Sequence, residues 1–161
     1  MEAVETLSRW AHVFTAVVLV GGAVFQRLAL LPVLKSLPED QRNALRGQIT
    51  ARWARVVHVG IGVLMLTGLY NMLNATGQDA LYHSLVGTKI LLAIAVFFIA
   101  SALVGRAEAF QGMRDKAGLW IGAIIILAAV IIAIAGFVKV RRDKKATSQV
   151  STPSQSYRNV A

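Results

Sequence analysis

The chain contains no cysteine. Disulfide bonds, iron–sulfur clusters and thiolate metal sites are therefore excluded, and a bound metal must use His, Met, carboxylate, Lys or backbone ligands. Charge is also scarce, because only 16% of the 161 residues are charged whereas 56% are hydrophobic. Soluble domains of this size rarely reach such a composition, so the composition indicates a membrane protein.

Acidic residues are the minority among the charges, since 17 Lys and Arg stand against 8 Asp and Glu, for a net charge of +9. A basic excess is typical of nucleic-acid binding, but here the positive residues flank long apolar runs. Cations in that position contact anionic lipid headgroups. We therefore expect the lipid bilayer as a partner and no nucleic acid.

Four apolar runs fill most of the chain, at residues 10–34, 53–73, 85–105 and 119–138. About 20 apolar residues in a helix cross the roughly 30 Å of bilayer hydrocarbon. Because lipid cannot satisfy backbone polar groups, such runs must be helices when they are too long for barrel strands. The sequence predicts an all-α fold, an integral-membrane four-helix bundle with both termini on one side of the bilayer, which we name side A.

The connections between the runs carry helix and turn signals. Residues 35–50 are polar and contain Pro38 before two acidic residues, which predicts a short interfacial helix between the first two spans. Pro32 is placed to bend or stop the first span. Residues 146–161 are rich in Ser, Thr and Gln, so we divide the chain into a bundle at 1–145 and a disordered polar tail. The 35–52 and 106–116 connections lie on the opposite side, side B.

Polar side chains inside the first three runs recur at helical spacing. The stripe on the first run is Ser8, His12, Thr15, Leu19, Gly22 and Gln26. The stripe on the second run is Arg55, His58, Gly62, Met65 and Leu69, and that on the third is Tyr82, Lys89, Ala93, Val96 and Ala100. Polar residues in a membrane usually face the bundle interior, so we expect these three stripes to point inward.

A first candidate site lies near side A. His12, Lys89 and His83 all fall within a layer of about 10 Å when depth is counted along the helices. We predict that His12 binds a cofactor or metal there, together with Lys89 or His83. His12 and His58 lie roughly 20 Å apart in depth, so we do not expect them to share one metal ion or one haem.

A second candidate site lies near side B. It contains His58 and Met65 as metal ligands, flanked by Arg27 and Arg55. A haem iron takes one or two axial ligands and arginines pair with its propionates, whereas a copper ion suits imidazole and thioether ligands. The cofactor, copper ion or haem b, stays open at this point.

Each of these residues also has a purely structural interpretation. A histidine near a helix end often makes an interfacial hydrogen bond. Lys89, Arg27 and Arg55 have stems long enough to carry their charges to the headgroups. Met65 at helical spacing is typical of packing, and His83 is typical of a surface loop.

Three motifs point to a known family. They are Arg52-Trp53-Ala54-Arg55, Leu66-Thr67-Gly68-Leu69-Tyr70-Asn71 and Tyr82-His83-Ser84-Leu85-Val86-Gly87-Thr88-Lys89. Together with His12 and Val20-Gly21-Gly22, they resemble the membrane domain of the copper-resistance protein D (CopD) family over about residues 8–110. The resemblance implies copper handling in the bacterial cytoplasmic (inner) membrane, by a short single-bundle member.

The chain also resembles, more distantly, the HemJ type of protoporphyrinogen oxidase. That resemblance implies roles for His12 and Lys89 in haem binding and activity. Three functions follow as hypotheses, namely a CopD-like protein with a redox-active metal centre, a haem-dependent porphyrinogen oxidase, and a non-catalytic small subunit of a larger membrane complex. Whether the protein is an enzyme stays open, and its partners would be an electron-transfer protein, that complex or a second copy of the chain.

Overall fold

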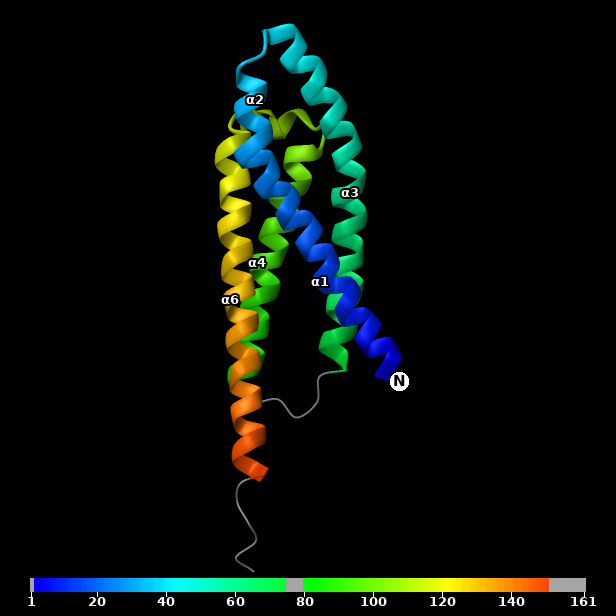
Figure 1. Cartoon of the computed structure of the whole chain (residues 1–161), viewed down its shortest axis with the longest axis vertical. Coiled ribbons are helices and arrows are strands. Elements are labelled where there is room, and N and C mark those ends of the chain that lie inside the picture. Colours follow the sequence, from blue (N-terminus) through cyan, green and yellow to red (C-terminus); the bar gives the residue numbers. More distant parts are fainter. Residues whose placement is uncertain (1, 75–79, 151–161) are drawn as a thin grey trace, which may run out of the picture.

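The computed structural model describes residues 2–74 and 80–150, and helices make up nearly all of this part of the chain (Figure 1). The predicted all-α fold is confirmed. Four helical segments are long and apolar enough to cross a membrane, and they are Glu2–Lys35, Glu39–Leu73, Ser84–Val104 and Ala117–Arg141. The chain therefore has the make-up of a membrane protein with four spans.

The first span contains a wide turn. It consists of α1 (Glu2–Phe25), the π-helix η1 (Gln26–Leu30) and α2 (Leu31–Lys35). In η1 the N–H of Leu31 donates to the carbonyl of Gln26, one residue further back than in an α-helix. Pro32 follows directly and has no N–H to donate. The helix is therefore locally widened before Pro32 and continues to Lys35, rather than stopping at the proline.

The second span is one uninterrupted helix, α3 (Glu39–Leu73). It begins directly after Pro38, as predicted, and residues 39–50 are helical. The prediction of a separate interfacial helix is wrong, however, because these residues continue into the apolar part of α3. No proline interrupts this stretch, and the single Gly47 is tolerated inside a helix.

The second half of the bundle is a helical hairpin. It consists of α4 (Ala80–Val104), the 3-10 helix η2 (Glu108–Phe110), α5 (Gln111–Asp115) and α6 (Ala117–Val150). The Arg114 guanidinium organises the connection by donating to the carbonyls of Gly105, at 3.2 Å, and Ala107, at 2.8 Å. Arg46 of α3 donates in turn to the Arg114 carbonyl. Of the predicted tail, residues 146–150 continue α6, and 151–161 lie outside the described residues.

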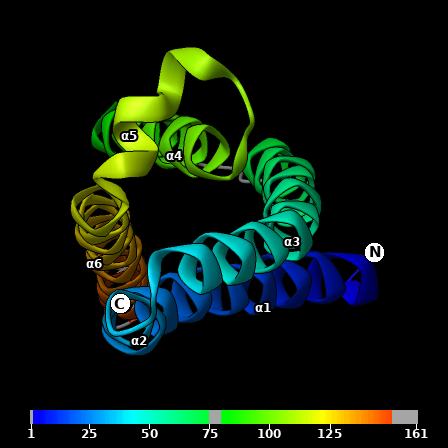
Figure 2. The ribbon, with the colours of Figure 1, turned by 90° about the horizontal axis from the view of Figure 1, so that it is seen from above.

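Viewed from above, the four spans form a ring in the order α1, α3, α4, α6 (Figure 2). The first span runs obliquely, so that its end at α2 lies near α6 and its N-terminal end lies near α3 (Figure 1). The most tightly packed core is in the side B half, where Ala23, Ile99, Ile121 and Ile124 meet. Many large apolar side chains are exposed on the outside, which is expected of a surface that faces lipid.

Candidate functional site

Close contacts at two glycines bring α1 and α3 together. A Cβ atom added to Gly22 of α1 would collide with the Trp53 indole of α3, and one added to Gly60 of α3 would lie 2.9 Å from Cδ1 of Leu19. Small residues allow membrane helices to approach closely in this way. The two contacts fix how α1 lies on α3, and this register decides what His12 meets further along the same interface.

His12 meets Thr67 and Gly68 of α3. Its Nδ1 atom lies 2.8 Å from the Thr67 hydroxyl oxygen, and a Cβ on Gly68 would lie 3.4 Å from its Cε1. The single hydrogen of the Thr67 hydroxyl is donated to the Val63 carbonyl, at 2.6 Å. The hydroxyl oxygen must therefore accept from His12, so that Nδ1 carries the hydrogen.

This hydrogen bond has a chemical consequence for the other ring nitrogen. A neutral imidazole with its hydrogen on Nδ1 carries a free lone pair on Nε2. Histidines that bind metals commonly donate their second ring N–H to a protein group, which fixes the tautomer and the ring orientation. The contact with Thr67 thus engages Nδ1 and does not use the lone pair of Nε2.

The predicted inward orientation of the first stripe is confirmed, because all of its members are partly shielded while Val13 and Val17 beside them are exposed. Ser8, one helical turn from His12 towards side A, has a buried hydroxyl oxygen with no hydrogen-bond partner among the described residues. The polar face of α1 therefore continues beyond His12 towards side A.

Lys89 is the cation that the sequence predicts as a partner of His12 in this site. It is half-buried on α4. Figure 2 shows α1 and α4 on opposite sides of the ring of helices. The structure therefore places an imidazole and an ammonium group on facing helices. His83 lies in the first turn of α4, and its side chain is outside the described part of the structure.

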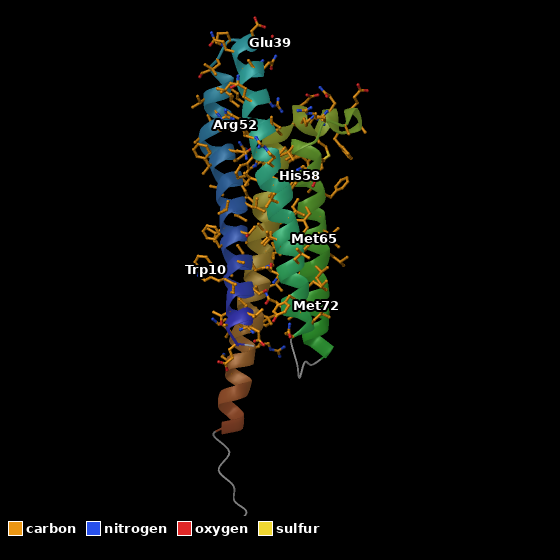
Figure 3. All side chains as sticks on the ribbon, turned by 90° about the vertical axis from the view of Figure 1, so that its right-hand side faces the viewer. Trp10, Glu39, Arg52, His58, Met65 and Met72 are labelled. Atoms are coloured by element: carbon orange, nitrogen blue, oxygen red, sulfur yellow. The ribbon has the colours of Figure 1, made fainter. Side chains whose placement is uncertain are left out.

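The residues of the predicted side B site are arranged differently. His58 is exposed, and its Nδ1–H donates to the Ala54 carbonyl of its own helix at 2.7 Å. Met65 is 60% exposed, and the two side chains lie at different levels of α3 (Figure 3). The prediction that the stripe of the second run faces inward is wrong, because α3 buries Val57 and Gly60 instead. A polar residue near the end of an apolar run can reach the interface from an outward face, so polarity alone misassigned this face.

Arg27 and Arg55 lie on different spans, Arg27 in η1 of the first span and Arg55 on α3. The Arg27 side chain lies across α6, with Nε 3.9 Å from a Cβ built on Gly122. Arg55 instead lines a groove between α1 and α3. The structure thus does not bring these two arginines together around His58.

Sequence reasoning gave Thr67 no role, although it lies in one of the quoted motifs. A signal was present, since Thr67 and Gly68 put a hydroxyl beside a position without a side chain inside an apolar run. Among the described residues, no group of three or more His, Asp or Glu side chains could hold a metal ion. The site at His12 is therefore made of nitrogen donors and hydroxyl groups.

Comparisons of the chain with protein-family models, curated proteins and solved structures found no match. The function is therefore argued from the residues of the site.

Proposed function

We propose that the protein is a CopD-like multi-pass protein of the bacterial cytoplasmic membrane that binds a redox-active metal centre through the Nε2 atom of His12. The observation that supports this proposal is the hydrogen-bond chain from His12 through Thr67 to the Val63 carbonyl. It fixes the imidazole in the tautomer that leaves Nε2 free for a metal. Interior polar residues in membrane helices are usually functional.

Of the two centres, haem b suits this donor set better than a copper ion. A haem iron needs only one or two protein ligands, and His12 and Lys89 are the nitrogen donors that would hold it. A copper ion relies on protein donors alone for its coordination. When bound, the haem would supply one-electron redox chemistry. His12 would hold the group, Thr67 orients the imidazole, and Lys89 would bind it as a second donor or neutralise one of its carboxylates.

The visible spectrum of the purified protein tests this proposal. We expect a Soret band and sharp α and β bands after reduction, and we expect His12→Ala to bleach or shift them. The matched control is His58→Ala, which removes an exposed imidazole on the outside of α3 and should leave the spectrum unchanged. Equal loss in both variants would contradict the assignment to His12.

Two other outcomes would also be decisive. A colourless protein that retains copper by elemental analysis, and loses it in His12→Ala, would replace haem by copper at the same residue. A colourless and metal-free protein would overturn the proposal and leave the non-catalytic subunit as the remaining hypothesis.

A second candidate function is the haem-dependent oxidation of a porphyrinogen. It is favoured by one observation, namely that His12 and Lys89 are both partly shielded and lie on helices that face each other across the ring of spans (Figure 2). These are the two residues to which the HemJ resemblance gives roles. The test is growth of cells that lack their own porphyrinogen oxidase. The wild type should rescue growth, and so should the control Lys139→Ala, which loses an exposed lysine. Lys89→Ala should not rescue growth. Failure of the well-expressed wild type to rescue growth would refute this function.

A further inference from the structure

The outer surface of the bundle carries a groove between α1 and α3. Its volume is about 360 Å³. Phe14 and Val59, which are 57% and 67% exposed, form its outer walls. Leu19 and Gly60 form its floor, where the missing side chain of the glycine lets the two helices meet.

The exposed Arg55 stands at one end of the groove, whose own surface is almost wholly apolar. Arg55 is the only ionisable residue among its lining residues, which are otherwise apolar apart from Thr15. The groove runs along α3 from Arg55 to Val63, about 12 Å at 1.5 Å per residue. It thus combines a cation at one end with an apolar channel that leads away from it.

The position of the groove in the bilayer matches the two parts of a lipid. Trp53 lies two residues before Arg55 on α3, and tryptophans favour the headgroup region at the ends of membrane spans. Arg55 therefore lies at headgroup depth on side B, while Val59, Gly60 and Val63 lie progressively deeper in the hydrocarbon. A guanidinium group binds phosphate oxygens through paired hydrogen bonds.

We propose that this groove binds an anionic phospholipid of the side B leaflet, with its phosphate at Arg55 and one acyl chain against Val59 and Gly60. The site lies on the outside of the bundle and does not depend on the proposed metal centre. The lipid covers an apolar surface that the helices leave open, and it bridges α1 and α3 along the interface that also positions His12.

Native mass spectrometry of the full chain tests the site with phosphatidylglycerol and phosphatidylcholine that carry identical acyl chains. We expect the wild type to bind phosphatidylglycerol at least about fivefold more tightly, since one arginine near a membrane surface contributes about that factor. Arg55→Gln should abolish this preference. The matched control, Arg52→Gln, removes the same charge one turn earlier, outside the groove, and should keep the preference.

A second variant tests the apolar part of the groove independently. Val59→Trp places a large ring in the channel without changing charge, and we expect it to reduce the binding of both lipids. This variant also keeps the test decisive should Arg55→Gln fail to fold. Equal binding of the two lipids to the wild type, equal losses in Arg55→Gln and Arg52→Gln, or undiminished binding to Val59→Trp would each overturn the proposal. So would a lipid-free dimer that Val59→Trp dissociates, because a second copy of the chain would then occupy the groove.

Discussion

Two adjacent glycines in α1 provide a sharp test of the contact between α1 and α3. A Cβ atom on Gly22 would collide with the indole of Trp53, whereas a Cβ atom on Gly21 would meet nothing within 4 Å. Gly21→Ala and Gly22→Ala therefore make the same chemical change in opposite environments. Both variants gain about 0.5–1 kcal/mol of helix stability, because alanine loses less backbone freedom than glycine.

Only Gly22→Ala also forces a rearrangement of Trp53. Overpacking of this kind costs about 1–3 kcal/mol. Because the gain in helix stability is common to both variants, their difference in unfolding free energy should equal this overpacking cost. For a chain of this size, such a difference separates the two melting temperatures by about 2–12 °C, with Gly21→Ala the more stable.

Thermal unfolding in detergent, followed by circular dichroism, measures this difference. Replacing the indole supplies the control, since Gly22→Ala in a Trp53→Leu background should be as mild as Gly21→Ala in the same background. Equal melting temperatures for Gly21→Ala and Gly22→Ala in the wild-type background would refute the close approach of α1 and α3. A difference that persists without the indole would refute Trp53 as its cause.

Three further predictions concern hydrogen bonds and charge. Thr67→Val should destabilise the protein by about 0.5–1.5 kcal/mol and weaken retention of the metal centre, whereas Thr67→Ser should preserve stability and retention. Unfolding and the visible spectrum measure these two effects. Equal behaviour of the two variants would argue against the hydrogen bond with His12. Lys89→Met should raise the melting temperature of the cofactor-free protein, because a charge within a membrane bundle is costly, and should lower cofactor content. A lower melting temperature would contradict the expectation that the half-buried Lys89 charge costs stability. Arg114→Ala removes donors to two carbonyls and to the Gln111 side chain, so limited proteolysis should cut the 105–116 connection faster than in the wild type. An unchanged rate of cleavage would show that these hydrogen bonds do not stabilise the connection.

The spans could be predicted from the sequence because their apolar runs dominate it. The third run, expected at 85–105, corresponds to the apolar segment Ser84–Val104, and the fourth, expected at 119–138, lies within Ala117–Arg141. The continuity of α3 could not be predicted. Its polar first turns and its apolar remainder differ in composition, but a change in composition does not end a helix when no breaking residue accompanies it.

The candidate site was only partly predictable. The inward position of His12 follows from helical spacing, which is a local property of α1. Its partner Thr67 lies 55 residues further along the chain, and their contact depends on how closely α1 approaches α3. That approach is set by Gly22 and Gly60 against Trp53 and Leu19, and pairings between helices are not encoded in the periodicity of either helix. His58 was misassigned for a different reason, because a polar residue near the end of an apolar run can reach the membrane interface without facing the bundle interior.

The helix α3 is long enough to reach from the site at His12 to the water outside the membrane. Its 35 residues extend for about 52 Å, whereas the hydrocarbon layer is only about 30 Å thick. The surplus is the polar first part of α3, which stands outside the hydrocarbon. Because the helix is unbroken from Glu39 to Leu73, a tilt of these outer turns would also displace the Thr67 hydroxyl that contacts the His12 ring.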